Sequence, residues 1–69
     1  MEVDARGLSC PQPIIETKKV VDKGAKSLSV LVDNIASKEN VMRFAKAMKF
    51  DVVVNDTDYG WKLDLKEND

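Results

Sequence analysis

Hydrophobic and polar residues alternate in four short stretches of this chain, and a period of two is typical of half-buried β-strands. The stretches are 1–6, Leu28–Val32, Phe50–Val54 and Trp61–Leu65. The last two are separated by residues 55–60, which are rich in turn-forming residues and predict a hairpin loop. The pattern therefore predicts four strands, the last two of them joined directly.

A helical period follows the first predicted strand and favours a helix from Pro11 to about Lys23. Proline suits the first turn of a helix, where the backbone N–H groups have no partner within the helix. Gly24 can adopt the left-handed conformation that commonly ends a helix. One face of this helix is expected to belong to the core, and it carries Ile14, Thr17, Val20 and Val21. Ile15 falls outside this stripe and is expected on the polar side.

A second helical period predicts a helix that is capped by Ser37, has Glu39 in its first turn and ends near Lys49. Its apolar stripe is expected in the core and consists of Val41, Phe44, Ala45 and Met48.

The resulting order, βαβαββ, predicts an α+β fold that forms a two-layer α/β sandwich. Two helices are expected on one face of a four-stranded mixed sheet, because β-α-β crossovers are nearly always right-handed. The opposite face is expected to be partly open, with Ser29, Leu31 and Val53 on it. At 69 residues the chain predicts a single domain that spans residues 1–69.

The composition narrows the classes of function. The net charge is −1, which argues against direct nucleic-acid binding, although Lys38, Arg43, Lys46 and Lys49 place positive charge on the second helix. There is no histidine and only one cysteine, so a Cys–His hydrolase and a Cys/His zinc site are excluded within this chain. A lone thiol suits a reducing compartment, and neither a signal peptide nor a membrane span is evident, so we expect a cytoplasmic protein.

The single cysteine, Cys10, directly precedes the first predicted helix in the sequence Cys-Pro-Gln-Pro. With Pro11 as the first helical residue, Cys10 takes the capping position, where free backbone N–H groups and the helix dipole favour thiolate over thiol. Arg6 lies four residues earlier, after which Gly7 permits a sharp turn. A nearby guanidinium would lower the pKa of the thiol further, whereas a nearby carboxylate of Asp4 or Glu16 would raise it. The alternative is that Cys10 is a small, buried and inert side chain.

The run from Asp4 to Pro13, Asp-Ala-Arg-Gly-Leu-Ser-Cys-Pro-Gln-Pro, followed by Lys18, resembles the signature of the TusA/SirA-like sulfur carriers. The resemblance extends over essentially the whole chain, including the order of elements. The segments Val32–Asn34, Glu39–Val41 and Arg43–Ala45 are similar to the N-terminal domain of YedF-like proteins, which are assigned to selenium metabolism.

The resemblance implies a protein that carries sulfane sulfur as a persulfide on Cys10. The sulfur donor would be a cysteine desulfurase or a rhodanese-like protein, and the acceptor another sulfur-relay protein, for example toward thiolation of transfer RNA. It implies supporting roles for Arg6, Gly7, Pro11, Gln12 and Pro13. It requires no cofactor, and the carrier would act as a sulfurtransferase only together with partner enzymes. Ile15 and Lys18, beside the cysteine in the sequence, are candidate contacts for those partners.

Two other functions remain open from the sequence. The chain can be a non-catalytic interaction or regulatory module that binds its partner through the open sheet face or around Ile15. In that case it can be a part of a two-domain YedF-like protein. It can also be a small nucleic-acid binder that uses the basic residues of the second helix, although a solvated helix face is the favoured explanation for these residues.

Overall fold

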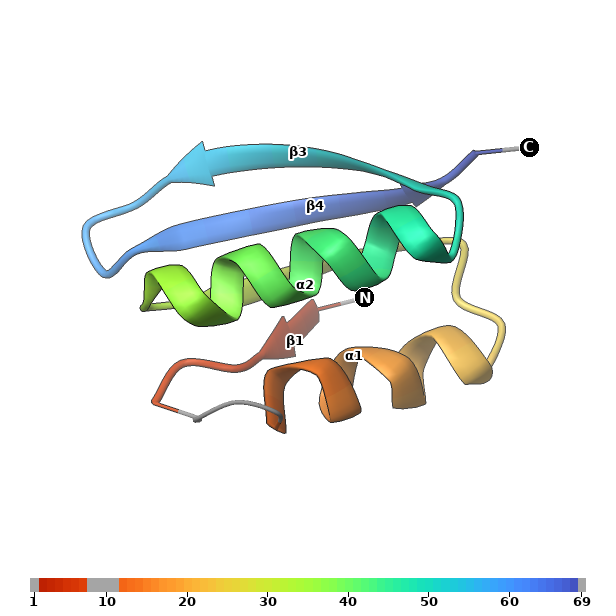
Figure 1. The fold of residues 1–69 in the computed structure, drawn as a ribbon, viewed down its shortest axis with the longest axis horizontal. Helices are drawn as coiled ribbons and strands as arrows, with labels where there is room; N and C mark the ends of the chain where they lie inside the picture. The colour runs from red at the N-terminus through yellow and green to blue at the C-terminus, as the bar shows by residue number, and fades with distance from the viewer. Residues whose placement is uncertain (1, 8–11, 69) are drawn as a thin grey trace.

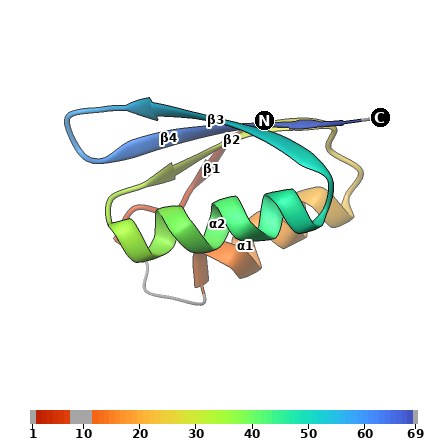
Figure 2. The same cartoon turned by 45° about the horizontal axis from the view of Figure 1, so that its top comes forward.

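Alternating apolar residues build a sheet whose inner face carries two amphipathic helices, as the computed structural model of residues 2–7 and 12–68 shows (Figure 1). The elements are β1 (Glu2–Asp4), α1 (Gln12–Asp22), β2 (Ser27–Val32), α2 (Ile35–Ala47), β3 (Phe50–Asp56) and β4 (Trp61–Glu67). Both helices lie on the same side of the sheet (Figure 2). The predicted α+β class, the element order and the two-layer arrangement are confirmed.

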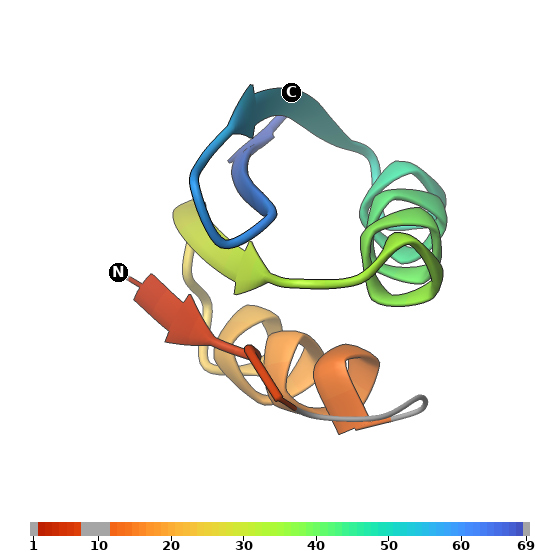
Figure 3. The same ribbon diagram turned by 90° about the vertical axis from the view of Figure 1, so that its left-hand side faces the viewer.

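The strands lie in the order β1-β2-β4-β3, so the sheet is mixed as predicted. β1 pairs with β2 in parallel, whereas β4 pairs antiparallel with both β2 and β3. The parallel pair needs a crossover, which α1 provides. As a consequence β1 and β2 end at the same edge of the sheet, where each strand leads toward a helix (Figure 3).

The core lies between the sheet and the two helices. Val30 and Leu63 face each other on the central strands and are both fully buried. Val41 from α2 is fully buried as well, and Ala5, directly after β1, is 0% exposed. The backbone N–H of Ala5 donates to the carbonyl of Leu31 at 2.9 Å, which extends the parallel pairing past the last residue of β1.

The outer face of the sheet is only partly open. Val53 is 58% exposed as expected, but Leu31 is 7% exposed despite lying on this face. The hydroxyl of Ser29 donates to Oδ1 of Asp64 at 2.6 Å across the β2–β4 pair. A hollow of about 490 Å³ lies on this face, and its lining includes Ser29, Asp51, Val53 and Asp64.

α1 buries a narrower stripe than predicted. Thr17 is fully buried and its hydroxyl donates to the carbonyl of Pro13 at 2.8 Å, while Ile14, Val20 and Val21 are half-buried. Gly24 has a φ of 92° and its N–H donates to the carbonyl of Val21 at 2.9 Å. The predicted helix end is thereby confirmed to within one residue. The predicted start at Pro11 lies outside the described residues.

The predicted start of the second helix is wrong. Asn34, not Ser37, caps α2, and its side-chain oxygen accepts from the backbone N–H of Ser37 at 2.8 Å. Ser37 therefore lies inside the first turn and is buried. The earlier start also places Glu39 beyond the first turn, which holds no acidic residue.

The end of α2 differs from the prediction as well. The helix ends at Ala47, and Lys49 adopts a left-handed φ of 64°, so the last two predicted residues belong to the turn into β3. Met48 is 44% exposed instead of buried, because it lies in this turn, whereas Ala45 is buried as predicted.

β3 and β4 are each longer than predicted, and the hairpin loop between them is correspondingly shorter. The pair extends from Phe50 opposite Glu67 to Asp56 opposite Trp61. The loop is closed by the N–H of Thr57, which donates to the carbonyl of Gly60 at 3.0 Å.

Within residues 2–7 and 12–68, neither helix has the length and apolar character that spanning a membrane requires.

Candidate functional site

Arg6 and Gly7, the predicted site residues that precede Cys10 in the sequence, lie at the edge of the sheet where β1 and β2 end. Because the two strands are parallel, the residues that follow each of them, Gly7 and Asp33, come together here. β4 begins at the same edge, since Trp61 pairs with Val32, and it brings the hairpin loop with it. Cys10 and Pro11 lie outside the described residues, so the predicted capping position of the cysteine stays a prediction.

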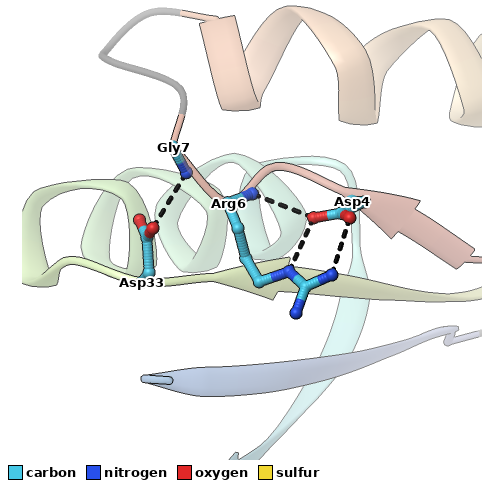
Figure 4. A network of polar contacts seen from close by, with 4 residues as sticks. All are labelled: Asp4, Arg6, Gly7 and Asp33. Atoms are coloured by element: carbon cyan, nitrogen blue, oxygen red, sulfur yellow. Dashed lines mark hydrogen bonds and ion pairs between the residues drawn. The ribbon is translucent and has the colours of Figure 1, made fainter.

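Arg6 is held by Asp4, two residues earlier at the end of β1 (Figure 4). The guanidinium donates from Nε to Oδ1 at 2.9 Å and from Nη2 to Oδ2 at 2.8 Å. The backbone N–H of Arg6 donates to the same Oδ1 at 3.1 Å. Such paired, charge-assisted hydrogen bonds fix the orientation of the guanidinium plane.

This pairing changes the electrostatic role expected for Arg6. Hydrogen bonds from the side chain and then the backbone N–H of Arg6 lower the pKa of Asp4 to about 2. The hydrogen bond with the Asp4 carboxylate in turn raises the pKa of the Arg6 guanidinium above its usual value. The two groups form an ion pair with little net charge, so the opposing effect of Asp4 that the sequence left open is present beside Arg6.

Gly7, the last described residue before Cys10 in the sequence, is held by a carboxylate from another part of the chain. Its N–H donates to Oδ2 of Asp33 at 2.9 Å, and the two residues are 26 positions apart (Figure 4). The φ of Gly7 is 77°, which confirms the sharp turn predicted there. The other carboxylate oxygen of Asp33 accepts from the side-chain amide of Asn34 at 3.3 Å.

The hairpin loop supplies two further contacts. The guanidinium carbon of Arg6 lies 4.7 Å from the centre of the Tyr59 ring, within the range of a cation–π interaction. Gly60 packs directly on the end of β2, where a methyl group on its Cα would come within 2.5 Å of the Val32 carbonyl oxygen and 2.7 Å of the Asp33 Cα. Its φ of 151° also disfavours other residues, so this close approach requires glycine.

The first turn of α1 carries Gln12 and Pro13, for which supporting roles were predicted. Gln12 donates from Nε2 to Oε1 of Glu16 at 2.8 Å, and this hydrogen bond, followed by one from Lys19, lowers the pKa of the Glu16 carboxyl. Pro13 is fully buried and its carbonyl accepts from Thr17. Gln12 and Pro13 thus stabilise the described start of the helix.

The two predicted partner contacts differ in how available they are. Ile15 is 41% exposed, as its place outside the apolar stripe predicted. Lys18 is exposed, but its ammonium forms an ion pair with Asp22 at 2.7 Å, one turn further along α1. Ile15 therefore offers an unobstructed apolar contact, while Lys18 would have to leave Asp22 to bind a partner.

The sequence did not predict the contacts that Asp33, Tyr59 and Gly60 make around Arg6 and Gly7. Asp33 directly follows a buried apolar strand, but its contact with Gly7 arises only from the parallel pairing of that strand with β1. Tyr59 and Gly60 fell within the predicted hairpin loop, and nothing in their local pattern indicates a contact with residues near the N-terminus.

Comparison with known proteins agrees with this architecture. The family model described as Sulfurtransferase TusA matches residues 1–66. The crystal structure of a SirA-like protein from Desulfitobacterium hafniense superposes with a TM-score of 0.83 and is 29% identical in sequence. The match covers 99% of this chain and 97% of that protein. Members of the TusA family act as sulfur relays with partner proteins. The chain belongs to the TusA family of sulfur carriers.

Proposed function

We propose that Cys10 carries sulfane sulfur as a persulfide, which it accepts from a cysteine desulfurase or a rhodanese-like donor and passes to an acceptor protein. Membership of the TusA family over residues 1–66 is the observation that carries this proposal. Cys10 is the only cysteine of the chain and is followed by the Pro-Gln-Pro sequence that the resemblance identified.

The chemistry is thiol exchange and needs no oxidant or cofactor. The Cys10 thiolate attacks the outer sulfur of the donor persulfide, the sulfur–sulfur bond breaks and the donor cysteine leaves as a thiolate. Cys10 then bears the persulfide. In the second step an acceptor thiolate attacks the same outer sulfur, and Cys10 is released as a thiolate.

The described residues supply a scaffold for this exchange. Before Cys10 in the sequence, Arg6 and Gly7 are each fixed by a carboxylate, that of Asp4 and that of Asp33. After Cys10, the described part of α1 begins at Gln12. Ile15, 41% exposed on the first helix, supports a partner contact beside the cysteine in the sequence. The partner enzymes would supply the enclosed site and the proton transfers, and thiolation of transfer RNA is one end use that fits.

The test is sulfur loading by a cysteine desulfurase and cysteine, followed by intact-protein mass spectrometry. We expect wild-type protein to gain about 32 Da, one sulfur atom, and to lose it again on reduction. Cys10→Ser should gain nothing. If wild-type protein takes up no sulfur from several desulfurases and rhodaneses, and Cys10→Ser behaves like it in every assay, the proposal is wrong.

A further inference from the structure

We propose that Asp33 is a positioning residue for sulfur exchange, because it fixes the backbone at the point from which the chain continues to Cys10. The proposal rests on the function proposed above and adds a residue from the β2–α2 junction to that site. Asp33 would act through Gly7, and it need not contact the sulfur itself.

The first observation is the hydrogen bond between Asp33 and Gly7. The carboxylate accepts from the Gly7 N–H at 2.9 Å, and an ionised acceptor makes this bond stronger than one to a neutral group. The bond joins residues that are 26 positions apart, so it ties the end of β1 to the start of α2. Gly7 lies three residues after the last residue of β1 and three residues before Cys10 in the sequence.

The second observation is that Asp33 is itself held in place. Its other carboxylate oxygen accepts from the Asn34 side chain at 3.3 Å. Its Cα lies against Gly60, so close that a Cβ on the glycine would be only 2.7 Å away. Gly60 in turn is fixed by the hydroxyl of Thr57, which accepts from its N–H at 3.1 Å. Gly60 of the hairpin loop therefore packs against the backbone of Asp33, and the Asp33 carboxylate extends from this backbone to the Gly7 N–H.

The third observation is that the neighbouring residue is fixed independently. Arg6 is bound by Asp4 through three hydrogen bonds and lies over the Tyr59 ring. Two successive residues are thus restrained by different parts of the chain, and the segment toward Cys10 starts from a defined position and direction. Group transfer is sensitive to such placement, since an error of about 1 Å can cost a factor of about 100 in rate.

A matched pair of variants separates positioning from charge. Asp33→Asn and Asp33→Ala both remove the negative charge, but only asparagine keeps an oxygen that can accept from the Gly7 N–H. Asp33→Ser provides a second variant without the acceptor, since its hydroxyl is one bond too short to reach from the same backbone. A difference between Asp33→Asn and the other two therefore reports the hydrogen bond alone.

Two measurements use these variants. The first is the single-turnover rate of sulfur uptake from a loaded cysteine desulfurase at several donor concentrations. We expect the maximal rate to fall about tenfold or more in Asp33→Ala and Asp33→Ser but to stay within about twofold of wild type in Asp33→Asn. The second is hydrogen exchange of the Gly7 amide, which should accelerate in Asp33→Ala and Asp33→Ser and remain protected in Asp33→Asn.

The outcomes distinguish this proposal from the function on which it rests. Equal transfer rates in Asp33→Ala and Asp33→Asn would overturn it, and so would a difference that merely follows the thermal stability of the variants. If wild-type protein takes up no sulfur, the proposed function fails, and the alkylation rate of Cys10 by iodoacetamide across the pH range replaces the first readout. A thiol pKa that is the same in Asp33→Asn and Asp33→Ala would then refute the positioning role.

Discussion

Asp4 and Arg6 show how two exposed side chains can fix a local geometry without contributing much to the stability of the fold. Their side chains are 54% and 42% exposed, and solvent screens ion pairs of this kind strongly. The value of the pair lies in geometry, because a bidentate contact and a backbone hydrogen bond fix Arg6 beside Tyr59.

The pair predicts an unusual acid titration of Asp4. The ionised form is favoured by Arg6, so the Asp4 carboxyl should titrate with a pKa of about 2, and Arg6→Ala should return it toward the ordinary value of 3.8. Because the folded-state pKa is lowered, the stabilisation by this pair is complete above the unfolded pKa. It is lost as the pH falls from about 4 through about 2.

Carbon-13 NMR of the Asp4 carboxyl measures this pKa directly in both proteins. Identical titration of Asp4 in wild-type protein and in Arg6→Ala would show that the hydrogen bonds do not persist in solution.

At the level of elements, the start of α2 is set by Asn34, whose side chain caps the helix. Asn34 and Ser37 both suit a capping position, but the backbone N–H of Ser37 is the donor and Asn34 the acceptor. The Ser37 hydroxyl is buried and has no hydrogen-bond partner within the part of the chain that the structure describes. The residue that the sequence favoured as the cap is therefore enclosed within the first turn of the helix.

Different effects are expected when each of these two residues is replaced by alanine. Asn34→Ala should lower the free energy of unfolding by about 1 kcal/mol, because the first turn loses its cap. Ser37→Ala should leave it unchanged or raise it by up to about 1 kcal/mol, since it removes a buried hydroxyl that lacks a partner among the described residues. Urea denaturation measures both, and a larger loss in Ser37→Ala than in Asn34→Ala would contradict the capping assignment.

Much of the fold could be predicted from the sequence, because apolar period and turn residues are local signals. They located all six elements but missed both ends of α2 and the last residues of β3 and β4. At the end of β3, Asn55 and Asp56 have little intrinsic preference for strands. Pairing with β4 holds these residues in the strand, since Asp56 lies opposite Trp61. The contact between Gly7 and Asp33 likewise depends on the parallel pairing of β1 and β2, which no local pattern encodes.

For the whole molecule, stability depends on a small core with little redundancy. The chain has 69 residues, and domains of this size bury a modest share of their surface. β4 is central to the core because it pairs with β2 on one side and β3 on the other, with Leu63 and Leu65 both almost fully buried. The outer face of the same sheet contributes less, as the 58% exposed Val53 illustrates.

Leu63→Ala and Val53→Ala should therefore differ sharply, although the two residues lie on adjacent strands. Leu63 is 0% exposed, so its truncation leaves a cavity and should cost about 3 kcal/mol, whereas Val53→Ala should cost less than about 1 kcal/mol. Since about 1 kcal/mol shifts the midpoint of a domain this small by several degrees, thermal denaturation followed by circular dichroism should separate them by more than about 10 °C. Similar losses in both would mean that the outer face is covered in solution, because only a buried valine would cost as much as Leu63.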